Sequence, residues 1–173
     1  MPTRSYTSRR ELEQHSFHPA VTLLVPVAAI VLQALLSRFP VVNIVDLPLI
    51  VTIFFAVSRR SPVAGALTGA AIGLLQDAIT AGAIGINGIA KTVIGYAAAS
   101  IGLQIDVENI TTRIVINFGF SLLNSILLFL INRRLIGQSG YHLQWPHELI
   151  RAAANTLVAI PIFLLLDRAK RTE

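Results

Sequence analysis

The sequence contains no cysteine, which excludes disulfide bonds, cysteine nucleophiles and thiolate metal sites. Charged residues are also scarce: Asp, Glu, Lys and Arg make up only 13% of the 173 residues, whereas soluble domains carry about a quarter. Long internal stretches are almost free of charge, and 54% of the chain is hydrophobic. This composition is typical of a protein that crosses a membrane several times.

The residue patterns that support catalysis or metal binding are missing as well. All four histidines lie outside the apolar runs, and the spacing of His142 and His147 does not suit a metal site. No serine stands in a nucleophile turn with a histidine at matching depth, and no glycine-rich loop follows a strand to hold a phosphate. We therefore predict that the protein is not an enzyme and has no metal and no cofactor.

The net charge of +5 and the pI near 10.4 raise the question of nucleic-acid binding. The Lys and Arg residues, however, stand in short clusters between apolar blocks. Such clusters are typical of residues that flank membrane spans. We therefore expect contact with membrane lipid and no binding of nucleic acid.

Six apolar runs predict an all-α, polytopic membrane protein with six transmembrane helices in a compact bundle, because about 20 helical residues cross a bilayer. We place a polar N-terminal tail at 1–18, the transmembrane domain at 19–167 and a basic C-terminal tail at 168–173. No small-residue cleavage site follows the first run, which favours a retained span over a signal peptide. The expected spans are 20–36, 46–57, 62–81, 86–105, 112–131 and 149–166.

Two helix starts carry a capping residue followed by proline: Asp46 precedes Leu47 and Pro48, and Ser61 precedes Pro62. The first of these starts leaves the second helix unusually short. Basic residues are more frequent on the side of the two termini, which favours a cytoplasmic location for both. Arg133–Arg134 is a basic pair that opposes this orientation.

Two opposite charges, Asp77 and Lys91, interrupt an apolar stretch in the predicted third and fourth spans. With alternating helix directions they lie at similar depth, and charges inside a membrane usually have a partner. We predict that these two residues face one another or share a polar pocket, with Asp46 as a possible third member. The alternative is that Lys91 alone reaches the lipid headgroups.

Three glycines, Gly65, Gly69 and Gly73, follow one another at steps of four and lead to Asp77. They form one face of a helix, where the missing side chains allow close approach of a second helix. Two interpretations remain open for this face. It docks the helix of a partner protein, or it packs against another helix of the same chain.

The predicted fifth span carries a polar stripe, Asn117, Ser121, Asn124 and Ser125, on one face. These side chains are suited to hydrogen bonds between helices, and contact with a ligand is the alternative. In the sixth span, Arg151 and Asn155 lie one turn apart, with Glu148 as a potential partner of Arg151.

The stretch that runs from DLPL through GLLQDA to AGAIGINGIAKTVIGY resembles the MreD family of bacterial rod-shape-determining membrane proteins. The likeness is recognisable over about residues 40–100. The matching positions are Asp46, Leu47, Pro48, Gly69, Gly73, Leu74, Asp77 and Gly85.

The resemblance implies a non-enzymatic subunit of the cell-elongation machinery in the bacterial cytoplasmic membrane. It implies docking to the single-span protein MreC and, through it, links to RodA, its class B penicillin-binding partner and MreB filaments. The implied fold is similar to the substrate-binding subunits of energy-coupling-factor transporters. A small-molecule-binding subunit of a vitamin-type transporter is the alternative function, with Asp46, Asp77 and Lys91 lining its pocket. A membrane enzyme acting on lipid is disfavoured, because no nucleophile with a base is present.

Overall fold

The computed structural model describes residues 16–37, 44–80, 83–105, 107, 109–137, 140, 143–168 and 170–171. Within these residues the chain forms six α-helices, one π-helical turn and a pair of two-residue strands. In chain order they are β1 Ser16–Phe17, α1 Pro19–Leu36, α2 Leu47–Arg59, α3 Pro62–Ile79, α4 Ile86–Gly102, α5 Ile110–Leu130, η2 Ile131–Leu135, α6 Trp145–Asp167 and β2 Lys170–Arg171. The predicted all-α fold is confirmed, apart from the short strand pair.

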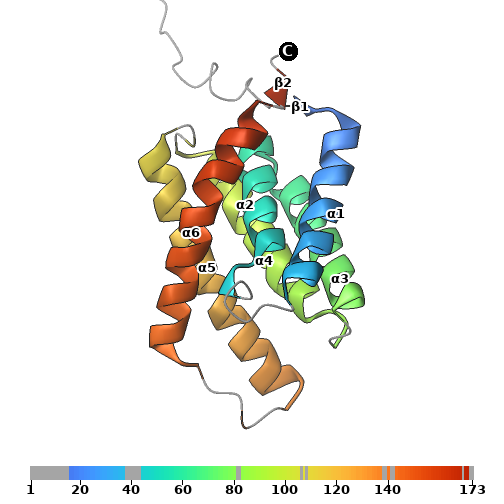
Figure 1. Cartoon of the computed structure of the whole chain (residues 1–173), viewed down its shortest axis with the longest axis vertical. Helices are drawn as coiled ribbons and strands as arrows, with labels where there is room; N and C mark the ends of the chain where they lie inside the picture. Colours follow the sequence, from blue (N-terminus) through green and yellow to red (C-terminus); the bar gives the residue numbers. More distant parts are fainter. Residues whose placement is uncertain are drawn as a thin grey trace, which may run out of the picture.

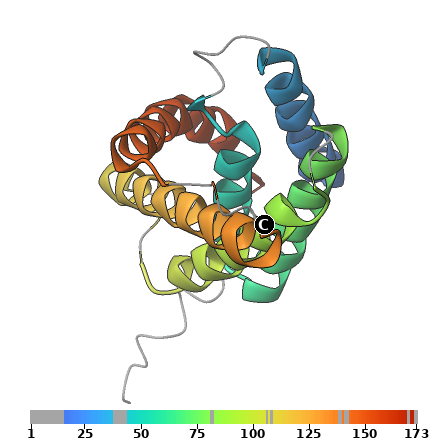
Figure 2. The same ribbon diagram turned by 90° about the horizontal axis from the view of Figure 1, so that it is seen from below.

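Helix α2 lies at the centre of the bundle, and the other five helices surround it (Figures 1 and 2). Residues 47–58 are all buried, which leaves only Arg59 of this 13-residue helix partly exposed. A helix that is apolar on every side is suited to such a position. The aromatic rings of Phe54 and Phe163 pack edge to face, with centroids 5.1 Å apart, and join α2 to α6.

Successive helices run in opposite directions, so the bundle has two ends (Figure 1). We name them the Asp46 end, where α2 begins, and the Arg59 end, where α2 ends. At the Arg59 end β1 pairs with β2 in antiparallel register, with Ser16 opposite Arg171. This pair joins the last residues of the predicted N-terminal tail to the predicted C-terminal tail.

Both predicted helix caps are confirmed. The Asp46 side chain accepts a hydrogen bond from the Leu49 N–H, and the Ser61 side chain accepts one from the Ala64 N–H. The short second helix is also confirmed. Helix α5 ends at Leu130, within one residue of the predicted end. The π-helical turn η2, which follows it to Leu135, was not predicted.

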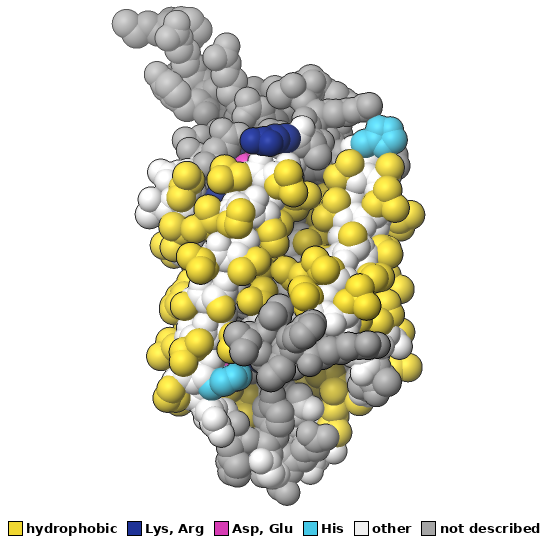
Figure 3. Space-filling model, viewed as in Figure 1, with side chains coloured by type: hydrophobic (Ala, Val, Ile, Leu, Met, Phe, Trp, Pro, Cys, Tyr) yellow, Lys and Arg dark blue, Asp and Glu magenta, His cyan; other side chains and the backbone are white. Residues whose placement is uncertain are grey.

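Among the described residues, three helical segments are long and apolar enough to cross a membrane: Pro62–Ile79, Ile110–Leu135 and Trp145–Asp167. Hydrophobic side chains cover the outward faces of α1 and α6 (Figure 3). Among them, Leu23 on α1 is 68% exposed and Leu157 on α6 is 72% exposed. Together, length, composition and apolar surface indicate a membrane protein, and the count of six spans stays a prediction.

Candidate functional site

The buried start of α2 is capped by a side chain of α1 and by Asp46, the residue that precedes α2. The Leu47 N–H donates to Gln33 Oε1 of α1 at 3.0 Å, and the Leu49 N–H donates to Asp46 Oδ1 at 3.0 Å. Pro48, between them, has no N–H to satisfy. The first backbone N–H groups of a helix lack hydrogen-bond acceptors within it. Burying them in an apolar interior without an acceptor costs free energy of folding. These contacts therefore allow α2 to begin inside the bundle.

The other carboxylate oxygen of Asp46 forms an ion pair with α4. Lys91 Nζ lies 3.0 Å from Asp46 Oδ2 and 3.2 Å from Asn87 Oδ1, one turn earlier on α4. The Lys91 side chain is fully buried, whereas that of Asp46 retains 17% exposure. Desolvation offsets much of the attraction in such a pair. Removing one partner, however, leaves the other charge buried without a counter-charge and is destabilising. The pair therefore fixes how α4 lies against the start of α2.

Asp77, at the end of α3, caps the start of α4. Its carboxylate accepts hydrogen bonds from the backbone N–H of Gly85 at 2.8 Å, Asn87 at 3.1 Å and Gly88 at 3.2 Å. It also accepts one from Asn87 Nδ2 at 2.8 Å. Gly85 is the capping residue of α4, has no side chain to serve this role and adopts a φ of +105° that favours glycine. A negative charge at this helix start is also favourable for the helix dipole.

The three charged residues predicted to form an intramembrane cluster thus lie close together, but Asp77 and Lys91 do not pair directly. Lys91 pairs with Asp46, and Asn87 connects both to Asp77 because its amide contacts Lys91 Nζ and the Asp77 carboxylate. Because Lys91 is fully buried, it does not reach the lipid headgroups alone.

A second branch leads from Asp46 to α5 and α6. The Asp46 N–H donates to Asn155 Oδ1 of α6 at 2.8 Å, and Asn155 Nδ2 donates to Ser121 Oγ of α5 at 3.1 Å. Further along, Ser125 donates to Glu148, which lies 3.6 Å from Arg151 NH1. Together the two branches form a polar network that connects all six helices at the Asp46 end.

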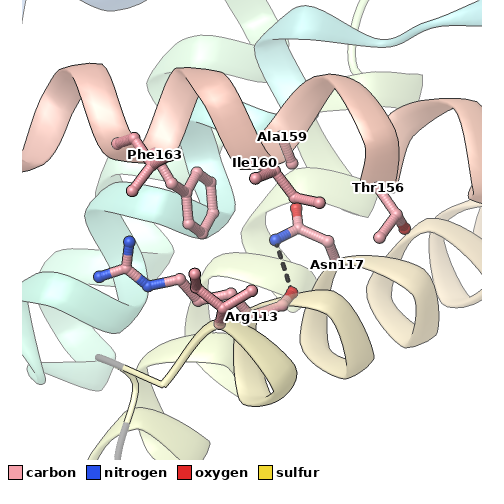
Figure 4. A pocket seen from close by; sticks show the side chains of 8 residues that line it. Arg113, Asn117, Thr156, Ala159, Ile160 and Phe163 are labelled. Atoms are coloured by element: carbon pink, nitrogen blue, oxygen red, sulfur yellow. Dashed lines mark hydrogen bonds between the residues drawn. The ribbon is translucent and has the colours of Figure 1, made fainter.

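The rest of the predicted polar stripe of α5 lies outside this network. Asn117 Nδ2 donates to the Arg113 carbonyl of the same helix at 3.0 Å. Asn117 Oδ1 is buried and has no hydrogen-bond partner among the residues that the structure describes. Asn124 is also buried, and no described residue donates a hydrogen bond to its Oδ1. Asn117 lines a cavity of about 10 Å³ between α5 and α6, together with Arg113, Thr156 and Phe163 (Figure 4). This is about the space that one water molecule requires.

The glycine face of α3 packs against α4. A Cβ atom on Gly65 would lie 2.3 Å from the Gly95 carbonyl oxygen, and one on Gly69 would lie 2.0 Å from the Lys91 carbonyl oxygen. A Cβ on Gly73 would lie 2.3 Å from the Asn87 carbonyl oxygen.

These distances leave no room for a further helix on the face. They correct the prediction that Gly65, Gly69 and Gly73 dock a partner, because α4 already fills that space. Of the two interpretations left open by the sequence, the second holds: the glycines pack against a helix of the same chain.

Three members of the network were not assigned to it from the sequence: Gln33, Asn87 and Asn155. Each is an amide inside or at the edge of an apolar helix, and each lies toward the Asp46 end. That combination was a usable signal, because an amide in an apolar span needs a hydrogen-bond partner.

The network is suited to bracing helices rather than to chemistry. The Asp77 carboxylate accepts hydrogen bonds from four donor groups, and both carboxylate oxygens of Asp46 are engaged. In the described part of the chain, no group of three or more His, Asp or Glu side chains is placed to hold a metal ion.

A family model described as "rod shape-determining protein MreD" matches residues 15–169. The chain belongs to the MreD family. Membership indicates a role in rod-shape determination, as a component of the shape machinery rather than as a member of an enzyme family. Neither the curated proteins nor the solved structures gave a match. The resemblance of the fold to energy-coupling-factor subunits therefore stays a prediction.

Proposed function

We propose that this MreD-family protein is a non-enzymatic subunit of the cell-elongation machinery in the bacterial cytoplasmic membrane. It docks the transmembrane helix of an MreC-like protein and thereby supports peptidoglycan synthesis and cell-shape control. RodA and a class B penicillin-binding protein join directly or indirectly, and MreB filaments join indirectly. Family membership and the apolar, helical architecture support this proposal.

The observation that carries the docking proposal is a groove on the outward side of α3 and α4, with a volume of about 300 Å³. Its lining is small or apolar apart from Thr92, whose hydroxyl donates to the Gly88 carbonyl at 2.7 Å. The groove therefore offers packing surface and no unmet hydrogen-bond donor, which suits a transmembrane helix. The lining residues are Ala70, Leu74, Gly85, Gly88, Ile89, Thr92 and Val93.

The same hairpin makes this surface rigid. The opposed backbones of α3 and α4 are in close contact through Gly65, Gly69 and Gly73, and Asp77 fixes the start of α4. A preformed surface loses little conformational entropy when a partner binds. Docking thus uses the outward side of the hairpin, while the glycines hold its two helices together.

The vitamin-binding alternative receives less support from the geometry. Small-molecule sites combine an apolar pocket with a few polar groups that converge on the ligand. Here Asp46, Asp77 and Lys91 satisfy one another or backbone donors within the bundle. The open groove between α3 and α4 has no charged side chain in its lining.

We further propose that both termini lie in the cytoplasm, so that the Arg59 end faces the side where MreB filaments assemble. Arg59, Arg60, Arg113 and Arg168 lie toward this end, as expected for the cytoplasmic side. Trp145 begins α6 at the opposite end and is 54% exposed, which suits an interfacial aromatic residue.

Filling the groove tests the docking proposal. Ala70→Trp places a large ring in the groove, whereas Ala71→Trp adds the same ring to the next, outward-exposed position of α3, which does not line it. The measurement is recovery of the MreC-like partner with the affinity-tagged protein from detergent-solubilised membranes. We expect at least about a tenfold loss for Ala70→Trp, or about 1.4 kcal/mol, and none for Ala71→Trp.

Equal amounts of inserted, folded protein are the condition for comparing the two variants, and fluorescence-detected size exclusion establishes it. Unchanged recovery with Ala70→Trp, or equal losses with both variants, would show that the partner does not use this groove.

A further inference from the structure

The guanidinium of Arg59 lies between α1 and α3 at the end of α2. Its NH2 group donates to Thr22 Oγ1 of α1 at 3.0 Å, and its NH1 group donates to Thr68 Oγ1 of α3 at 3.3 Å. The guanidinium carbon lies 5.7 Å from the centre of the Phe55 ring. These contacts hold a flexible side chain in one place, which is the usual condition for a binding group to be effective.

The positive charge of Arg59 has no carboxylate partner among the residues that the structure describes. The four described carboxylates contact other groups: Asp46 contacts Lys91, Asp77 the start of α4, Glu148 Arg151, and Asp167 Arg113. A guanidinium has five N–H donors in a fork that matches carboxylate and phosphate oxygens. The two threonines take two of these donors, so three remain.

We propose that Arg59, held by Thr22 and Thr68, binds the phosphate of a membrane phospholipid and prefers an anionic headgroup. A guanidinium without a carboxylate partner is better balanced by a lipid with net negative charge than by one whose own ammonium offsets its phosphate. Basic sites between transmembrane helices are known places for lipid headgroups. The binding site consists of α1, α3 and the end of α2.

The position of the site favours a lipid over a soluble anion. Thr22 lies in the first turn of α1 and Thr68 in the second turn of α3, roughly 5–9 Å along each helix from its start. This depth is where long basic side chains reach the headgroup layer. Leu23 follows Thr22, and Val63 and Leu67 form the ridge beside Thr68, with all three at least 67% exposed. These side chains offer apolar surface to the acyl chains.

Native mass spectrometry of the full-length protein in detergent tests the site. The protein is titrated with phosphatidylglycerol, with phosphatidylcholine and, in a separate arm, with inorganic phosphate. We expect the wild type to retain phosphatidylglycerol at least about tenfold better than phosphatidylcholine. Arg59→Gln should lose most of this preference. Arg168→Gln removes an equal charge from an exposed position after α6 and should keep it.

Three outcomes would overturn the proposal. Equal losses in Arg59→Gln and Arg168→Gln would show a general effect of surface charge. Equal retention of the two lipids by the wild type would show that no selective site exists. Retention of inorganic phosphate by the wild type, lost in Arg59→Gln, would identify a free anion instead of a lipid.

A second variant decides the question if Arg59→Gln fails to fold. Thr22→Val with Thr68→Val keeps the charge but releases the guanidinium from its two acceptors. We expect this double variant to lose at least about threefold of the lipid preference, and unchanged preference would contradict the role of the two threonines. The site is independent of the partner groove, so failure of either proposal leaves the other standing.

Discussion

The α3–α4 pair and the α5–α6 pair are both antiparallel neighbours, but different contacts hold them together. Between α3 and α4 the backbones meet, because glycines on α3 face carbonyl oxygens of α4. Between α5 and α6 the contacts are made by side chains, including Asn155 with Ser121 and Arg113 with Asp167. A small cavity remains between this second pair, and within the described part of the chain Asn117 Oδ1 beside it has no hydrogen-bond partner.

The difference teaches where this fold tolerates change. An interface made of backbone atoms, such as that between α3 and α4, cannot accommodate an added side chain. The opposing carbonyl groups belong to a helix that must move as a whole. An interface made of side chains, such as that between α5 and α6, adapts by changes of rotamer, and the cavity there leaves space for such changes. The α3–α4 hairpin is therefore the inflexible part of the bundle, and α5–α6 the more adaptable part.

The largest expected effect is from Gly69→Val, because a Cβ atom there would lie 2.0 Å from the Lys91 carbonyl oxygen. We expect a loss of about 3 kcal/mol or more in stability, or failure to accumulate in the membrane. Gly119→Val on α5 is the control, since nothing lies within 4 Å of its added Cβ. Thermal unfolding in detergent measures both, and a small loss for Gly69→Val would refute the close packing of α3 on α4.

A somewhat smaller effect is expected from Lys91→Met, which leaves the Asp46 carboxylate without its buried partner. Breaking such a pair costs about 3 kcal/mol, whereas replacing both partners is tolerated better. The double variant Lys91→Met with Asp46→Asn should therefore recover a large part of the loss. A double-mutant cycle by thermal unfolding measures this coupling, and strictly additive losses would show that the ion pair does not brace α4 against α2.

The smallest effects compare two asparagines of the α5–α6 pair. Asn155→Leu removes two hydrogen bonds between elements and should cost about 1–2 kcal/mol. Asn117→Leu removes one bond within its own helix, eliminates a buried oxygen without a partner and fills the cavity, so a change within about 0.5 kcal/mol is expected. Chemical or thermal unfolding measures both. The comparison fails if Asn117→Leu is the more damaging of the two.

Local signals made part of this structure predictable. Asp46 with Pro48 and Ser61 with Pro62 carry the chemistry of a helix start within a few residues, and both act as the caps expected of them. The apolar runs likewise place the helices, because their length and composition need no knowledge of the neighbours. The π-helical turn η2 was less predictable, since it extends past the apolar run that places α5.

The sequence places the charged residues along each helix, but it does not fix how each helix is rotated about its own axis. The pairing within the candidate site depends on that rotation. Depth alone matched Lys91 with both Asp46 and Asp77, and the choice between them depends on how α4 turns toward α2. The same uncertainty applied to the glycine face. A small-residue stripe attracts a helix from its own chain or from another by the same packing, so spacing alone does not identify the occupant.

Because α2 contacts protein on every side, bilayer thickness does not select its length. Its 13 residues reach about 20 Å, whereas the hydrocarbon layer is about 30 Å thick. Matching of hydrophobic length to bilayer thickness therefore applies to the five surrounding helices. The length of α2 depends only on the helices that pack around it. A hydropathy window as long as a lipid-facing span does not register such a helix, because its 13 residues are too few.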